Sequence, residues 1–154
     1  MQTFLPYEDF DKSAAILDNR RLNKQLLEGR QIAGIIVSRK TTGGWVNHPA
    51  VNMWRKHHIL FYKYLSAIVR ECDKREISYM NNWQEINKIY RTIGGEWIIP
   101  KWLGNEKFHL SHRQNLYIKD PEHYAIFKQD SEKEKVRCCK KCNYWWPTHI
   151  GDKE

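Results

Sequence analysis

The sequence predicts a mostly α-helical protein, folded as a single compact domain with long first and second helices and a short C-terminal tail rich in cysteine and aromatic residues. Apolar residues recur at helical spacing in several stretches, and no stretch alternates apolar and polar residues for long. The 154 residues are enough to bury one core. A hydrophobic content of 41% and an aromatic content of 13% favour a folded chain over a disordered one.

The first helix is expected to run from Asp11 or Ser13 to about Val37, ending at the segment RKTTGG (39–44). One stripe at helical spacing forms its expected core face: Ala15, Leu22, Leu26, Gly29, Ala33 and Ile36. A second long helix is expected to start at His48-Pro49, because proline suits the first helical position. Its expected core stripe is Val51, Trp54, His58, Phe61, Leu65, Ile68 and Cys72.

Three shorter helices are expected in the second half of the chain. Asn81 or Asn82 can cap one that ends at Tyr90, and Asn105 can cap another that reaches about Ile118. Between them, GGEWIIPKW (94–102) is expected to be a loop or short extended segment, and Asp120-Pro121 opens a final short helix. The charged run KQDSEKEKVR (128–137) predicts a solvated linker. We therefore expect a helical domain over 1–127 and, over 128–154, a linker and a tail that packs on it.

The net charge of +8, from 26 Lys and Arg against 18 Asp and Glu, favours a polyanionic partner. Nucleic acid fits this surplus better than a membrane surface, because no basic helix has a clean apolar face. An inert basic surface is the alternative. No apolar run is long enough to span a membrane, and no secretory signal is recognisable at the start. A cytoplasmic, intracellular protein is expected.

A polar stripe on the first helix is a candidate active site. Its members are three or four positions apart and so lie on one side of the helix: Arg21, Lys24, Glu28 and Gln31. A carboxylate among cations can move protons or stabilise positive charge during a reaction. The alternative is a surface helix with a weak Lys24–Glu28 ion pair.

The stretch GGWVNHPAVNMW (43–54) combines a flexible hinge with a helix start. Asn47 and His48 can cap the following helix and face a phosphate there, while Trp45 can stack on a base. The alternative is a cap flanked by two core tryptophans. Trp54 fits the core stripe and Trp45 is the freer of the two.

Two further groups of residues have side chains that can bind a ligand or take part in catalysis. HLSHRQN (109–115) places His109, His112 and Arg113 close together on a helix, where they can contact phosphate or transfer protons, or can simply be surface residues. In the tail, Cys139-x-x-Cys142 can chelate zinc, with His149 and Cys138 or a distant histidine completing four ligands. The alternative is a cluster of reduced thiols beside a packed aromatic tail, Tyr144-Trp145-Trp146.

These motifs together resemble the pyrimidine dimer DNA glycosylase, or endonuclease V, family of small α-helical phage, viral and bacterial proteins. The likeness rests on LDNRRLNKQLLEG (17–29), on the Asn-His-Pro element in GGWVNHPAVNMW, and on the long helix ending near ECDKREIS (71–78). It covers roughly residues 1–80. WLGNEKFHLSHRQNLYIKDPEHY (102–124) and YWWP (144–147) are similar to a bacterial and phage branch, and that likeness extends over most of the chain.

The resemblance implies a DNA glycosylase with AP lyase activity on damaged or modified pyrimidines, acting on double-stranded DNA as a monomer that requires no cofactor. In that family the N-terminal α-amine attacks the sugar C1′ to form an imine, after the target base has been flipped out of the duplex. An unperturbed α-amine has a pKa of about 8, about two units below that of lysine, so part of it is neutral at physiological pH. Glu28 takes the role of the family's glutamate. Bulky Gln2 disfavours removal of the initiator methionine, so the amine belongs to Met1.

Further positions carry over with differences. Arg21 stands where the best-known member has a histidine, and Asn47 and His48 match the Asn-His-Pro element. The residues expected to contact DNA are Arg21, Lys24, Gln31, Trp45, Asn47, His48, His109, His112 and Arg113. Two arginines of the family are replaced here by Leu27 and Gln31. Fewer cations near Glu28 leave open a non-catalytic nucleic-acid-binding module on the same fold. A different DNA-directed enzyme with a zinc-binding tail is a third hypothesis.

Overall fold

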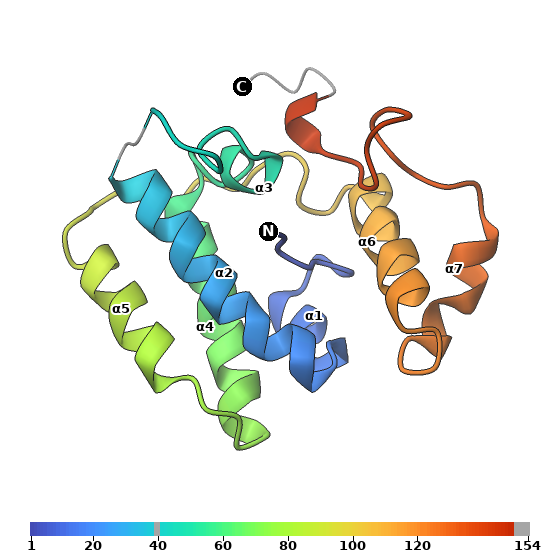
Figure 1. The fold of residues 1–154 in the computed structure, drawn as a ribbon, viewed down its shortest axis with the longest axis horizontal. Helices are drawn as coiled ribbons and strands as arrows, with labels where there is room; N and C mark the ends of the chain where they lie inside the picture. The colour runs from blue at the N-terminus through green and yellow to red at the C-terminus, as the bar shows by residue number, and fades with distance from the viewer. Residues whose placement is uncertain (39–40, 150–154) are drawn as a thin grey trace.

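The chain folds into helices joined by turns and loops (Figure 1), as the computed structural model of residues 1–38 and 41–149 shows. These described ranges contain no strand, so the expectation of a mostly α-helical fold is confirmed. The elements are α1 (Phe10–Ile16), α2 (Asn19–Val37), α3 (Pro49–Asn52), α4 (His58–Lys74), α5 (Met80–Tyr90), α6 (Glu106–Lys119), η1 (Ala125–Phe127), α7 (Lys128–Glu132) and η2 (Pro147–His149).

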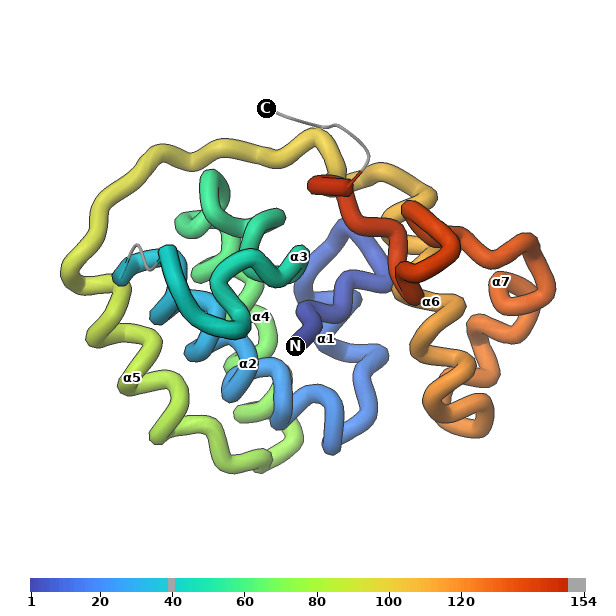
Figure 2. Tube along the Cα trace, turned by 45° about the horizontal axis from the view of Figure 1, so that its top comes forward, coloured from blue at the N-terminus to red at the C-terminus, as the bar shows by residue number. Residues whose placement is uncertain are grey.

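The helices form two groups on either side of the N-terminal segment (Figure 1). In one group α2 packs against α4 and α5, and α1 packs against α4; in the other, α6 packs against α7 and η1. A long connection over residues 91–105 carries the chain from α5 to α6 (Figure 2). The N-terminus lies near the middle of the molecule in both views. The two groups are thus brought together around the first residues of the chain.

The expected first helix is two helices, because the chain breaks at Leu17 and Asp18. Leu17 has an extended backbone, and the Asp18 side chain accepts a hydrogen bond from the backbone N–H of Arg21 at 3.0 Å. This N-cap starts α2 afresh. Ala15 consequently lies exposed at the end of α1, whereas most of the expected stripe on α2 is buried. The helix ends at Val37 with Ser38 as its C-cap, and Arg39 and Lys40 of the expected terminating segment lie outside the described residues.

The expected second helix starts where predicted but is interrupted. Pro49 occupies the first turn of α3 and the His48 side chain caps it, accepting from the Ala50 N–H. The chain then leaves the helix between α3 and α4, which turns Trp54 into the core. There the indole N–H donates to Thr3 Oγ1 at 3.1 Å. His58, expected in the core, is half-buried, and its Nε2 lies 3.1 Å from the Gly94 carbonyl oxygen.

The later elements follow the expected order with shifted starts. α5 begins at Met80 without a side-chain cap, so neither Asn81 nor Asn82 caps it. Asn105 does cap α6, accepting from the Lys107 N–H. The run expected to be a linker begins with α7, which is held to α6 by an ion pair between Arg113 and Asp130. Residues 150–154 of the tail lie outside the described residues.

The tail packs on the helices through its aromatic side chains. Trp145 and Trp146 are buried in the core, and the backbone N–H of Trp145 donates to Ser111 Oγ at 2.8 Å. Across residues 1–38 and 41–149, no helix combines the length and the apolar character that crossing a bilayer requires.

Close packing of α2 on α4 depends on Gly29. A Cβ at this position would lie 2.3 Å from Leu65 Cδ2, and Leu65 is itself fully buried and cannot easily change rotamer. Gly34, on the same helix, has open space at its Cβ position.

We therefore predict that Gly29→Ala lowers the free energy of unfolding by about 1–3 kcal/mol, because the added methyl overpacks the core. Gly34→Ala is the matched control and should be neutral or stabilising by up to about 1 kcal/mol. Urea unfolding of both variants measures the difference. Equal stability of the two variants would contradict the packing described here.

Candidate active site

The N-terminal segment is an extended strip of buried backbone without a partner strand. Gln2, Thr3, Phe4 and Leu5 are all buried. Their backbone polar groups must therefore find partners, because an unpaired buried group costs about as much as a lost hydrogen bond. Side chains from α2, α4 and α6 supply most of them.

Gln25 on α2 ties down the first half of this segment. Its Oε1 accepts from the Phe4 N–H at 2.9 Å and its Nε2 donates to the Gln2 carbonyl oxygen at 3.2 Å. The Tyr64 hydroxyl on α4 donates to Gln25 Oε1 at 2.7 Å, and its oxygen also lies 3.1 Å from the Phe4 carbonyl oxygen. Burial and the nearby Glu28 carboxylate raise the pKa of Tyr64 well above its ordinary value, so the hydroxyl keeps its proton. The two helices thus hold one backbone between them.

The second half of the N-terminal segment is bound by three side chains of α6: His109, His112 and Arg113. His109 Nε2 accepts from the Gly104 N–H, so its Nδ1 carries the proton and donates to the Leu5 carbonyl oxygen at 2.8 Å. His112 Nδ1 accepts from the Leu5 N–H at 3.1 Å, and Arg113 donates to the Pro6 carbonyl oxygen at 2.9 Å. All three side chains are buried. This corrects the expectation that they contact DNA: they bind the chain's own backbone instead.

Glu28 meets the first residues of the chain at the centre of α2. Its Oε2 accepts from the Gln2 backbone N–H at 3.1 Å and lies 3.5 Å from Gln25 Nε2. Its Oε1 lies 3.6 Å from Lys24 Nζ. Because Gln2 is bonded directly to Met1, the carboxylate is placed next to the N-terminal residue.

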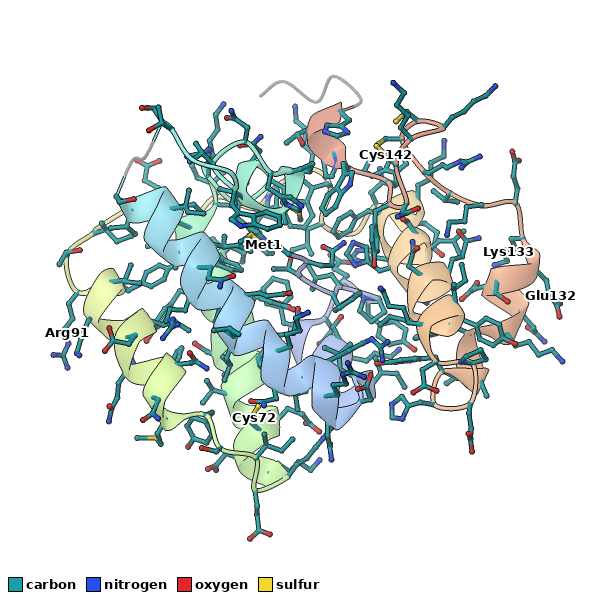
Figure 3. The ribbon with its side chains drawn as sticks, in the orientation of Figure 1. Met1, Cys72, Arg91, Glu132, Lys133 and Cys142 are labelled. Atoms are coloured by element: carbon teal, nitrogen blue, oxygen red, sulfur yellow. The ribbon has the colours of Figure 1, made fainter. Side chains whose placement is uncertain are left out.

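Met1 and Glu28 line the same cavity, which has a volume of about 400 Å³. The cavity is lined by Met1, Gln2, Phe4, Arg20, Arg21, Lys24, Gln25, Glu28, Lys119 and Tyr144. Met1 lies between α2 and α6 in Figure 3. Glu28 is the single carboxylate among these lining residues, whereas four of them are Lys or Arg. The cavity therefore combines one buried anion with a basic rim.

His48 lies close enough to the N-terminal amine to respond to its charge. Burial lowers the pKa of His48, and the positive charge of the amine lowers it further. The His48 ring also contacts the rings of Trp45 and Trp146, with centroid separations of 5.4 and 5.9 Å. The Asn-His-Pro element is thus adjacent to the site that Met1 and Glu28 form.

Arg21 is fixed at the cavity wall by an ion pair. Its Nη1 donates to Asp18 Oδ2 at 2.7 Å, and the Tyr124 hydroxyl donates to the same oxygen at 2.5 Å. Burial alone would raise the pKa of Asp18, but the hydrogen bonds from Tyr124 and Arg21 outweigh it and lower this pKa to about 2. The guanidinium therefore keeps a charged partner while it faces the cavity.

The structure brings together only part of the expected DNA-contact set. Arg21 and Lys24 line the cavity with Met1 and Glu28, but Gln31 lies exposed and does not. Trp45 is 54% exposed, as expected for the freer tryptophan. Asn47 is also exposed and lines a different, larger cavity of about 550 Å³ with Arg55 and His58. The smaller cavity is the candidate active site because both Met1 and the buried Glu28 line it.

Several lining residues were not found from the sequence. Gln25 shares a helix face with Glu28 at a spacing of three, and Arg20 adjoins Arg21, so the helical pattern contained a signal for both. Lys119 and Tyr144 reach the cavity from distant parts of the chain, and no local pattern indicates them. The expected metal ligands Cys138, Cys139 and Cys142 do come together, in the turn that precedes the aromatic tail.

Comparison with known proteins identifies one family. The model of the family described as pyrimidine dimer DNA glycosylase matches residues 1–88, which is more than half of the 154 residues. The matched range includes Met1, Gln25, Glu28 and His48, but not Lys119 or Tyr144. No curated protein and no solved structure matches the chain.

The buried imidazole of His112 makes stability depend on pH. Burial lowers its pKa from the ordinary 6.5 to about 3, and the nearby charges of His109 and Arg113 act in the same direction. Between pH 6.5 and 3 the unfolded chain therefore binds a proton that the folded chain does not, so stability falls as the pH falls through this window.

We predict that, between pH 7 and pH 4, the free energy of unfolding falls by up to about 3 kcal/mol more for the wild type than for His112→Asn. Asparagine offers Oδ1 to the Leu5 N–H but does not titrate. Chemical unfolding of both proteins across this range measures the difference. If the stability difference between them does not change with pH, His112 is not buried as a neutral ring.

Proposed function

The chain belongs to the pyrimidine dimer DNA glycosylase family, and on this premise we propose that it releases damaged or modified pyrimidines from double-stranded DNA and cleaves the resulting abasic site. The proposal assigns the α-amine of Met1 as nucleophile and Glu28 as the carboxylate that assists it. AP lyase activity and the residue roles go beyond the family assignment and are the parts to be tested.

The observation that supports this assignment is the shared cavity of Met1 and Glu28. The Gln2 N–H donates to Glu28 Oε2 at 3.1 Å, which anchors the chain one residue after the amine. A nucleophile and its assisting group must be held together before the substrate arrives, and a fixed backbone does this at little entropic cost. The amine of a surface lysine, in contrast, lies at the end of a flexible side chain and has no fixed backbone next to it.

The proposed reaction begins when the neutral amine attacks C1′ of the flipped-out nucleotide. The bond between C1′ and the base nitrogen breaks, and its electron pair leaves with the base, which takes up a proton. Glu28 stabilises the positive charge that develops on the sugar. Loss of protons from the amine and opening of the sugar ring give an imine. Removal of a proton from C2′ then expels the 3′ phosphate and cuts the strand.

The basic rim is proposed to hold the phosphates on either side of the extruded nucleotide. Arg20, Lys24 and Lys119 are exposed at the cavity and face it from two helices. Phosphate contacts position DNA without reading its sequence. Trp45, Asn47 and His48 are proposed to contact the strand beside this rim, because His48 adjoins the cavity and Trp45 packs on it.

The two replaced arginines support a non-catalytic module less strongly than the sequence suggested. Leu27 and Gln31 are exposed and do not line the cavity. Arg20 and Lys119 provide positive charge there instead. The basic character of the site is therefore maintained, so the two replacements are not an argument against catalysis.

We predict that Glu28→Gln slows base release by about 10²-fold or more, because the transition-state charge loses its carboxylate. The measurement is single-turnover cleavage of the bond between C1′ and the base in a duplex with a hydroxymethylated pyrimidine or a cyclobutane thymine dimer; in the dimer the cleaved base stays joined to its neighbour. Affinity for the same duplex should change little.

Glu71→Gln is the matched control. Glu71 is also paired with a cation four residues away and its side chain is 14% exposed, against 10% for Glu28, but it lies on α4 outside the cavity. The rate of base cleavage by Glu71→Gln should stay within about twofold of the wild-type rate, because Glu71 does not contact the reacting groups. Unchanged release by Glu28→Gln would exclude the assigned role, and binding without any release by the wild type would favour a DNA-binding module.

We further predict that Lys119→Ala weakens DNA binding and reduces the slope of log K against log salt by about 1, because one phosphate contact is lost. Lys88→Ala, an exposed lysine on α5 remote from the cavity, should leave the slope unchanged. Fluorescence anisotropy over a range of salt concentrations measures both. Equal slopes for the two variants would mean that Lys119 does not contact the DNA backbone.

A further inference from the structure

Three cysteine thiols gather in the turn before the aromatic tail, and His149 in the short helix after it approaches two of them. The sulfur atoms of Cys138, Cys139 and Cys142 all lie within 4.8 Å of one another. His149 Nδ1 lies 3.4 Å from Cys138 Sγ and 3.5 Å from Cys142 Sγ. Figure 3 shows Cys142 at the end of α6, away from Met1.

We propose that Cys138, Cys139, Cys142 and His149 bind a structural zinc ion. In tetrahedral zinc sites Zn–S is about 2.3 Å and Zn–N about 2.0 Å, which separates sulfur from nitrogen by about 3.6 Å and sulfur from sulfur by about 3.8 Å. The two distances from His149 agree with this within about 0.2 Å. Cys139 Sγ and Cys142 Sγ, 3.0 Å apart, would need to separate slightly as the ion enters.

The backbone and the local charge also suit a zinc site. The Cys142 N–H donates to the Cys139 carbonyl oxygen at 3.1 Å, which closes a tight turn around the Cys-x-x-Cys pair. Zinc with three thiolates and one neutral imidazole carries a net charge of −1. Lys140 and Lys141, the two residues inside the turn, supply compensating positive charge.

Packing alone does not explain the cluster. Cys139 and His149 are exposed, so the ligands are not gathered by burial of apolar surface. The remaining cysteine, Cys72, shows the contrasting case, because it is fully buried in the core and burial raises its pKa to about 11. Three thiols and an imidazole that meet at the surface are the donor set of a structural zinc site, in which four protein ligands close the coordination sphere.

The ion would fix one wall of the active-site cavity. The loop between Cys142 and His149 includes Tyr144, which lines the cavity with Glu28, and Trp146, which packs against His48. The Cys138 N–H donates to the Tyr144 carbonyl oxygen at 3.2 Å, which links the cluster directly to this wall. Zinc would therefore act at a distance from the reaction, as a clamp on residues 138–149.

The test is the metal content of the full-length protein, purified under reducing conditions and offered Zn²⁺. We expect about one zinc ion per chain. Cys139→Ser and His149→Ala should lose it, whereas Cys72→Ala and His123→Ala, the control cysteine and histidine, should keep it. Replacement by Co²⁺ should give the intense visible absorption of a tetrahedral thiolate site, and this absorption should disappear when Zn²⁺ is added.

A second measurement tests the clamp. Trypsin should cleave after Lys140 or Lys141 much faster once a chelator has removed the metal, while Lys88 in α5 stays equally protected. Failure of the reduced protein to bind zinc, or equal zinc content in wild type and the Cys139→Ser and His149→Ala variants, would overturn the proposal. This proposal goes beyond the glycosylase assignment and does not rest on it, because metal content and proteolysis are measured without DNA.

Discussion

The structure depends on the burial of an extended N-terminal segment whose backbone is satisfied by side chains. Every backbone N–H from Gln2 to Tyr7 donates to a side-chain acceptor, except at Pro6, which has none. Because an unpaired buried amide is costly, each of these acceptors is a structural requirement. Helices α2, α4 and α6 thus pack around a backbone that none of them could accommodate with apolar side chains alone.

The same constraint positions the proposed catalytic groups. Glu28 accepts from the Gln2 N–H, so the bond that completes the buried backbone also sets the carboxylate beside the N-terminal residue. The surrounding cations and the half-buried Tyr144 enclose this pair, and burial raises the pKa of Tyr144 to about 12, so its hydroxyl keeps its proton at physiological pH. If Met1 and Glu28 act as proposed, stability and catalysis depend on one network, and substitutions in it will affect both.

The sequence predicted the helical class and the cavity-facing side of α2 because both follow from short-range periodicity. It did not predict the break at Asp18, since an N-cap inside a continuous apolar stripe gives only a one-residue signal. It assigned His109 and His112 to DNA because they lie close to Arg113 on one helix, where the three side chains could contact phosphate. Their burial follows from contacts with Leu5, more than a hundred positions away, which no local pattern encodes.

The most direct test of the proposed mechanism is borohydride trapping on a labelled duplex that contains an abasic site, followed by peptide mapping of the adduct. We expect a covalent complex with the DNA attached to the α-amine of Met1. An adduct on a lysine such as Lys24 would mean that the anchored N-terminus is not the nucleophile. If no adduct forms although the duplex is bound, the imine mechanism would be contradicted altogether.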